Sequence, residues 1–125
     1  MATPNQVLVT SDPTSNLLEC VFVGDIGPAE YARFEVALEQ ALVPLSAGFH
    51  LLIDLTHLDS MDLRLVPAVG KAMDLYRSRG VARVVRIIPD PSKDIGLGIM
   101  SIFHYPRGLK IITCENRTEA LRALA

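Results

Sequence analysis

The segment from Phe49 to Leu55, FHLLIDL, constrains the fold most, because it is an apolar strand with almost no polar alternation. A strand that is apolar on both sides has to be covered on both faces of its sheet, which is typical of parallel sheets. A second apolar strand is predicted from Val81 to Ile88. We therefore predict an α/β fold in which parallel central strands are joined by right-handed helical crossovers.

The chain is predicted to begin with an antiparallel pair of strands. Val7–Val9 and Leu17–Val23 are apolar, and the turn-forming stretch Ser11–Asn16 separates them. This connection is too short for a helical crossover, so a hairpin is expected. The same shortness excludes a phospho-receiver domain, which would also place an aspartate where Asp54 stands but needs a helix between its first two strands.

Four helices are predicted from apolar residues at helical spacing and from capping residues. They cover Ala29–Leu45, Leu65 to Gly80, the stretch from Asp90 through Phe103, and the residues after Asn116. A last strand is predicted at Leu109–Cys114. The element order is therefore β-β-α-β-α-β-α-β-α.

Length and composition limit the class of protein. A chain of 125 residues is expected to form a single domain over residues 1–125. The net charge of −2 argues against nucleic acid as a partner, and the apolar runs are too short for a membrane span. The first residues, MATPNQ, lack the pattern of a secretory signal, so we expect a cytoplasmic protein. Cys20 and Cys114 have no metal or redox spacing, and we expect packed thiols, with a disulfide as the alternative.

Four segments carry a resemblance to a known family. GDIGPAEYARFEVALEQAL, IDLTHLDSMD, VARVVRIIP and GLKIITCENRTEALRAL together resemble STAS domains, the bacterial anti-sigma-factor antagonist family. The resemblance covers nearly the whole chain, although each motif is short. It implies an α/β, SpoIIAA-like mixed sheet, with an N-terminal antiparallel hairpin followed by parallel βαβ units and four helices.

The chain departs from the family where the family is usually regulated. If Met61-Asp62 matches the family's hydrophobic-Asp pair, Leu63 and Arg64 stand where serines are usual. A leucine cannot accept phosphate, so we expect the usual serine phosphorylation switch to be absent. Ser60 is the nearest hydroxyl, and it is either a displaced acceptor or an ordinary loop residue bonded to its own backbone.

The resemblance also implies where a protein partner would bind. The expected face is the loop Thr56 to Arg64 with the N-terminal half of the following helix, and acidic residues there would favour a basic partner. The partner would be an anti-sigma-like regulator or another signalling protein, and the domain is expected to be non-enzymatic. The candidate partner-binding residues are Thr56, Asp59, Ser60, Asp62 and Arg64.

The same region is the densest polar cluster, formed by Asp54, Asp59 and Asp62 with His57. Such a cluster could hold a divalent cation or do acid-base chemistry. Solvated carboxylates beside a helix N-terminus are the alternative, and we expect that one, with neither metal nor cofactor.

A second function remains open, that of a small-molecule or lipid-binding module of SpoIIAA/Sec14-like architecture. Ser92 and Lys93 lie at a predicted helix N-terminus, which attracts anions. The run Phe103-His104-Tyr105 either lines a ligand pocket or packs a helix end into the core. These five residues are the candidate ligand-binding residues. Separately, the hairpin is expected to leave an open sheet edge, through which a homodimer could form.

Overall fold

The computed structural model of the protein describes residues 5–88, 105 and 108–125. Five strands form one sheet, in which their spatial order follows their order in the chain. The strands are β1 (Gln6–Asp12), β2 (Leu17–Ile26), β3 (His50–Met61), β4 (Arg83–Ile87) and β5 (Lys110–Cys114).

The predicted N-terminal hairpin is confirmed. β1 pairs with β2 in the antiparallel direction, from Gln6 opposite Val23 to Asp12 opposite Leu17. β1 continues further than predicted, because its polar last residues pair with β2 although their composition is typical of a turn. The remaining pairs, β2 with β3, β3 with β4 and β4 with β5, are all parallel, as the apolar central strands predict.

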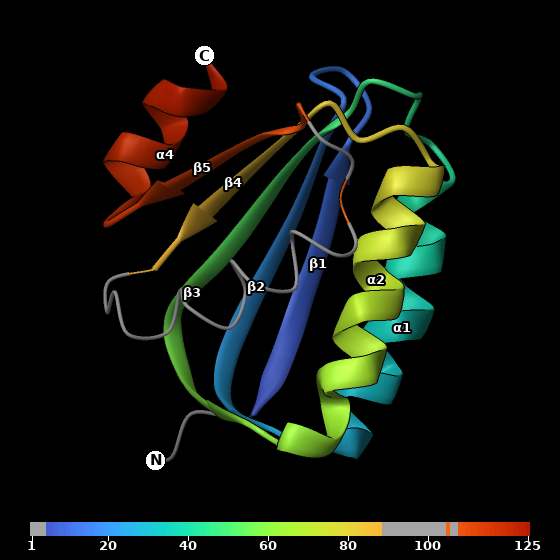
Figure 1. The fold of residues 1–125 in the computed structure, drawn as a ribbon, viewed down its shortest axis with the longest axis vertical. Helices are drawn as coiled ribbons and strands as arrows, with labels where there is room; N and C mark the ends of the chain where they lie inside the picture. Colours follow the sequence, from blue (N-terminus) through green and yellow to red (C-terminus); the bar gives the residue numbers. More distant parts are fainter. Residues whose placement is uncertain (1–4, 89–104, 106–107) are drawn as a thin grey trace.

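Helices cover both faces of the sheet (Figure 1). The helices α1 (Pro28–Leu42) and α2 (Val66–Ser78) lie together on one face, and α4 (Arg117–Leu124) lies on the other. A larger core packs under α1 and α2, and a smaller one, with Leu52, Val85 and Ala120, packs under α4. β3 and β4 contribute to both cores, which explains their lack of polar alternation.

The fold class is therefore a mixed α/β sheet with an antiparallel start, but the count of four helices is not supported. The part of the chain that the structure describes holds three α-helices and a short 3₁₀ helix, η1 (Leu63–Leu65). The predicted helix through Phe103 falls outside the described residues. α1 ends at Leu42 and not at Leu45.

The end of β3 corrects the sequence-based expectation. A loop was expected after Leu55, whereas β3 continues to Met61 and pairs with β2 up to Ile26. The pairing is irregular, because Gly24 lies opposite Leu58 while the next residue, Asp25, lies opposite Ser60. Such bulges bend a strand, and the lower half of β3 is visibly curved in Figure 1. Polar residues suit this stretch because Thr56, His57, Asp59 and Ser60 are exposed to solvent.

Both cysteines are free and buried, which confirms the expectation of packed thiols. Cys20 belongs to the larger core and Cys114 to the smaller one. Burial raises the pKa of the Cys20 thiol to about 12 and raises that of Cys114 as well. Within the described ranges, no helix has both the length and the apolar character needed to cross a bilayer.

Candidate functional site

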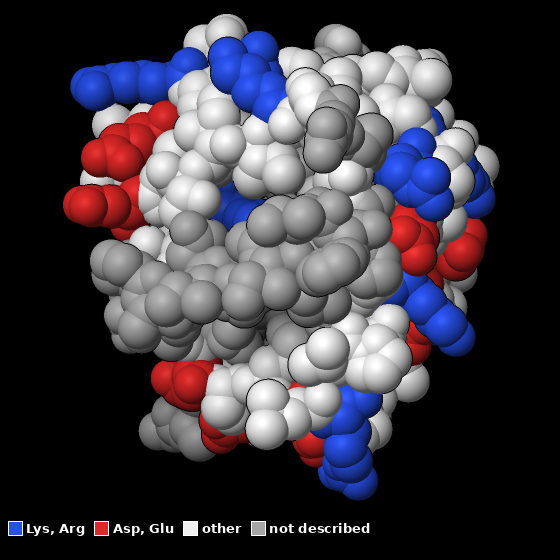
Figure 2. Space-filling view, in the orientation of Figure 1, with Lys and Arg blue, Asp and Glu red and all other residues white. Residues whose placement is uncertain are grey.

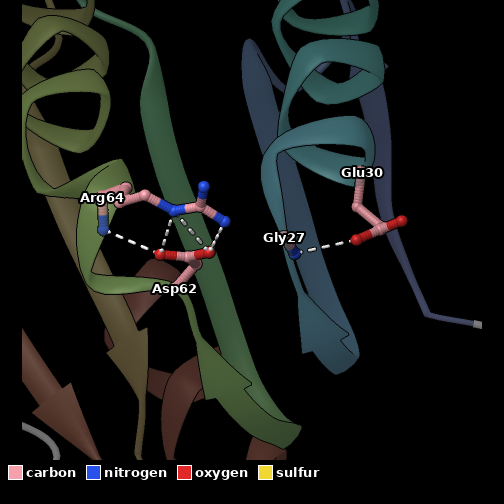
Figure 3. Close-up of polar contacts among 4 residues, drawn as sticks. All are labelled: Gly27, Glu30, Asp62 and Arg64. Carbon is pink, nitrogen blue, oxygen red and sulfur yellow. Dashed lines mark hydrogen bonds and ion pairs between the residues drawn. The ribbon is translucent and has the colours of Figure 1, made fainter.

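The candidate site lies at the edge of the sheet where β2 and β3 both end. The Asp62 backbone N–H donates to the carbonyl of Ile26 at 2.9 Å, which holds the two strand ends side by side. α1 starts directly after β2, and the Gly27 N–H donates to the Glu30 carboxylate at 2.8 Å (Figure 3). A helix therefore leaves each strand at the same edge.

Asp62 organises the turn after β3. Its carboxylate accepts the Arg64 backbone N–H at 2.9 Å, which caps η1. The same carboxylate accepts Arg64 Nε at 3.0 and 3.1 Å and Nη2 at 2.6 Å, as Figure 3 shows. Hydrogen bonding by Arg64 lowers the pKa of Asp62 to about 2, and the carboxylate in turn raises the pKa of Arg64. The turn is thus closed by an ion pair that stays charged at neutral pH.

This pairing changes the expected electrostatics of the site. The sequence suggested that acidic residues such as Asp62 give the face a negative potential that favours a basic partner. Because the two charges lie in contact, they largely cancel at a distance. Figure 2, in the orientation of Figure 1, shows both acidic and basic side chains at the lower edge of the molecule, where β3 ends.

Two exposed apolar side chains adjoin this ion pair. Leu63 is 84% exposed and Val66, the first residue of α2, is 48% exposed. The sequence drew attention to Leu63 only as a residue that cannot be phosphorylated, since a helical pattern does not reveal which apolar residues stay outside the core. We call the surface around this turn the η1 face and define it by Asp59, Ser60, Asp62, Leu63, Arg64 and Val66.

Ser60 lies in β3 and not in a loop. Its hydroxyl donates to the Asp25 carboxylate on the neighbouring strand at 2.7 Å. Asp25 is itself held by its backbone N–H, which donates to Asn5 Oδ1 at 3.0 Å. Gly24 allows the Asn5 side chain to lie this close to β2, because Gly24 has φ +77° and an added Cβ would lie 2.2 Å from Asn5 Oδ1. The alternative in which Ser60 bonds to its own backbone is therefore wrong.

Thr56 and Asp54 belong to a different group of residues. The buried Asp54 carboxylate accepts the Thr56 hydroxyl at 2.5 Å and Arg117 Nη1, from α4, at 3.2 Å. Arg117 also pairs with Glu19. Asp54 therefore faces α4 and is not part of a cluster with Asp59 and Asp62. Within residues 5–88, 105 and 108–125, no three or more His, Cys, Asp or Glu side chains are grouped so as to hold a metal ion.

Four of the five candidate ligand-binding residues, Ser92, Lys93, Phe103 and His104, lie outside the described residues. Tyr105 is described, and its side chain is buried in the larger core. Tyr105 also lines a pocket of about 520 Å³ between the sheet and the helices α1 and α2. Tyr105 therefore packs in the larger core and also lines the pocket.

Comparison with solved structures shows the fold. An uncharacterised protein of the DUF3478 family from Shewanella loihica PV-4, with a SpoIIAA-like fold, superposes with a TM-score of 0.75 at 20% identity, over 100% of this chain and 98% of that one. The anti-sigma factor antagonist SpoIIAA, in its unphosphorylated form, superposes with a TM-score of 0.59 at 12% identity, over 94% of each chain. No protein-family model and no curated protein sequence matches the chain. The chain therefore has the SpoIIAA-like, STAS-type fold that its sequence predicts.

Proposed function

We propose that this chain is a non-enzymatic, STAS-like regulatory domain that binds another protein through the η1 face. The observation that carries the proposal is the exposure of Leu63, at 84%, on a turn that is fixed by the ion pair of Asp62 and Arg64. Covering a leucine side chain releases about 1.5–3 kcal/mol. Because the turn is already ordered, a partner that covers Leu63 would lose little of this free energy to ordering the loop.

The composition of the η1 face supports a protein partner. Leu63 and Val66 provide an apolar centre, and Arg64 and Asp59 provide a charged rim, which is the usual anatomy of a protein–protein contact. The likeness to SpoIIAA, which is an anti-sigma factor antagonist, suggests an anti-sigma-like regulator or another signalling protein as the partner. We place the domain in the cytoplasm, and the net charge of −2 gives it no general attraction for nucleic acid.

Several features support a role without catalysis. Both thiols are buried and their pKa values are raised, so neither is a ready nucleophile. At the η1 face, Asp62 is engaged by Arg64, and Asp25 accepts the hydroxyl of Ser60. The carboxylates of Asp62 and Asp25 are therefore bonded to neighbouring side chains of the same fold.

The test uses an exposed leucine on the opposite face of the sheet as a matched control. Three forms of the chain are used to capture proteins from the cells that make it: wild type, Leu63→Asp and Leu121→Asp. Leu121 lies on α4 and is 53% exposed. The partner is the protein retained by wild type and Leu121→Asp but lost by Leu63→Asp. With that protein purified, Leu63→Asp is expected to weaken binding at least about tenfold, as for a central contact residue. Equal binding by all three proteins would show that the partner does not bind through the η1 face.

We also propose that the η1 face is not switched by phosphorylation, because Leu63 has no hydroxyl and Ser60 is bonded to Asp25. Phosphopeptide mapping of the chain isolated from its own cells is expected to find Ser60 unmodified. Stoichiometric phosphate on Ser60 would overturn this part of the proposal and leave the binding face itself untouched.

Association of two copies is a separate part of the proposal. β1 is an edge strand of the sheet, and its Leu8 side chain is exposed. An open edge can pair with a second copy. Gel filtration over a range of concentrations tests for a homodimer, and Leu8→Lys is expected to weaken it.

A further inference from the structure

The pocket between the sheet and the helices α1 and α2 is lined mostly by aliphatic and aromatic side chains. Its volume is about 520 Å³, which lies within the range of small-molecule sites. Phe34, Ile53, Leu55 and Met73 are among the residues that form its wall. A molecule in this pocket would therefore exchange water for apolar contacts over most of its surface.

The pocket reaches the surface at the η1 face. Asp59, Ser60, Leu63 and Val66 line it, and all four are exposed. Phe34 also lines it, and this residue is buried in the larger core. The pocket therefore runs from the η1 face into the larger core, so a ligand can enter from solvent and leave again.

Three buried tyrosines line the pocket, and the hydroxyl groups of two of them are already used. Tyr31 donates to the Ala68 carbonyl at 3.2 Å, and Tyr76 is hydrogen-bonded to the Cys20 thiol. Tyr105 differs from both. Its side chain is only 7% exposed, and its hydroxyl has no hydrogen-bond partner among the described residues.

A buried hydroxyl without a partner is rare in folded proteins, because the group loses its hydrogen bonds to water and gains none in return. Phenylalanine in place of Tyr105 would fill the same space without this loss. Burial also raises the pKa of Tyr105, so its phenol is protonated at neutral pH and can donate. A hydrogen-bond acceptor on a bound molecule would satisfy this donor.

The charged residues that line the pocket favour a neutral ligand. Asp59 is exposed at the surface, and Asp62 is paired with Arg64. Arg86 is buried, but it already takes part in an interaction within the protein. An ion in the buried part of the pocket would therefore find no uncommitted opposite charge among the described lining residues. Burying an ion without such compensation is strongly unfavourable, whereas a neutral acceptor avoids this cost.

We propose that this pocket binds a neutral, mostly apolar small molecule that carries a carbonyl group, such as a ketone or an ester. The carbonyl oxygen accepts a hydrogen bond from the Tyr105 hydroxyl, and the apolar body lies against Ile53, Leu55 and Met73. This inference does not depend on the proposed protein partner, because the pocket is tested on the isolated chain.

Three probes with the same naphthalene body test the pocket by NMR of the isolated protein. Acetylnaphthalene carries a ketone, ethylnaphthalene has no acceptor, and naphthoate is an anion. Acetylnaphthalene is expected to shift the methyl signals of Ile53, Leu55 and Met73 saturably. Naphthoate is expected to bind at least about tenfold more weakly, because its charge would be buried without compensation. No saturable shift with acetylnaphthalene, or equal affinity for naphthoate, would overturn the proposal.

Tyr105→Phe tests the hydrogen bond itself, and it is expected to fold normally because it removes a hydroxyl that has no partner. The ketone and the hydrocarbon differ in their affinity for water, so the quantity to compare is the ratio of their two affinities in each protein. Tyr105→Phe is expected to lower the ratio of acetylnaphthalene to ethylnaphthalene affinity about tenfold. An unchanged ratio would refute the site.

Tyr31→Phe is the matched control, since Tyr31 lines the same pocket but its hydroxyl already donates to Ala68. This variant is expected to leave the ratio unchanged, and an equal fall in both variants would show that Tyr105 has no special role. Loss of partner capture in Leu63→Asp together with an unchanged ratio in Tyr105→Phe would overturn the ligand site alone. The two proposals can therefore fail separately.

Discussion

The Asp54 carboxylate accepts a hydrogen bond from the Arg117 guanidinium at 3.2 Å, which joins the middle of β3 to the first turn of α4. The two residues are 63 positions apart in the chain. Asp54 is buried while Arg117 is half exposed, and Arg117 also pairs with Glu19 of β2. One side chain thus fixes α4 against two strands, and it does so around a carboxylate that needs compensation in its buried position.

Arg117→Met is expected to lower the free energy of unfolding by about 1–2 kcal/mol, because it leaves a buried carboxylate with fewer donors. Urea denaturation followed by circular dichroism measures this change. Arg122→Met is the matched control, since Arg122 is an exposed arginine on the same helix, and it is expected to have little effect. Equal effects of the two substitutions would mean that the Asp54 contact adds no stability.

The stability provided by Asp62 is expected to depend on pH in the acid range. In the folded protein its pKa is lowered to about 2 from an ordinary value of 3.8, chiefly by hydrogen bonds from Arg64. The folded state therefore holds the ionised form more strongly than the unfolded state does. Its contribution is complete above about pH 4 and disappears as the pH falls towards 2. NMR titration of the Asp62 carboxyl carbon checks the pKa directly.

Two substitutions separate the contacts made by Asp62. In Arg64→Met the side-chain hydrogen bonds are removed while the cap of the backbone N–H remains, so the pKa of Asp62 is expected to rise part of the way to 3.8. In Asp62→Ala both contacts are lost, and the thermal midpoint is expected to fall further than in Arg64→Met. An Asp62 that titrates near 3.8 in the wild type would contradict the ion pair.

Ser60→Asp is expected to destabilise the protein by about 0.5–1 kcal/mol, since it places a second carboxylate opposite Asp25 on the adjacent strand. Ser60→Ala removes only an exposed hydrogen bond and is expected to cost less. The comparison by thermal unfolding at low ionic strength also bears on regulation, because a phosphate on Ser60 would meet the same repulsion. If added salt does not reduce the difference between the two variants, repulsion is not its cause.

His50 is expected to titrate below its ordinary pKa of 6.5. Burial lowers its pKa first, and the charge of Arg83, its neighbour on β4, lowers it further. The folded state therefore disfavours the protonated imidazole. The contribution of His50 to stability is complete above pH 6.5 and declines as the pH falls through the lowered pKa. NMR titration of the imidazole protons measures this pKa, and Arg83→Gln is expected to raise it. An unchanged pKa in that variant would exclude Arg83 as a cause.

Much of the fold follows from local patterns. The short connection after Val9 dictated a hairpin, and the apolar runs that start at Phe49 and Val81 dictated parallel pairing in the middle of the sheet. The length of β3 did not follow, because Thr56, His57 and Asp59 are polar residues of the kind that loops use. They remain in a strand because their neighbours on β2 satisfy the backbone and because the bulges adjust the register.

The sequence predicted which segment forms the candidate site but not the contacts within it. Residues 59–64 were expected at the surface, and the exposed positions of Asp59, Ser60, Leu63 and Arg64 agree with this. Their contacts were not foreseen, since Asp25 and Ser60 are far apart in the chain and the pairing of Asp62 with Arg64 depends on the backbone of η1. Thr56 was grouped with these residues by sequence proximity, although it bonds to Asp54 beside α4.

The sequence by itself determined the hairpin, the parallel sheet and the order of the elements other than the predicted helix through Phe103, because spacing and turn residues act over a few neighbouring positions. Only the tertiary structure decided that Arg86 lies in an apolar pocket with Tyr105, that Arg117 reaches Asp54, and that Leu63 stays outside the core. These outcomes depend on which residues, distant in the chain, come into contact when the helices pack on the sheet. Packing of that kind is set by the whole chain and leaves no periodic signal in any one segment.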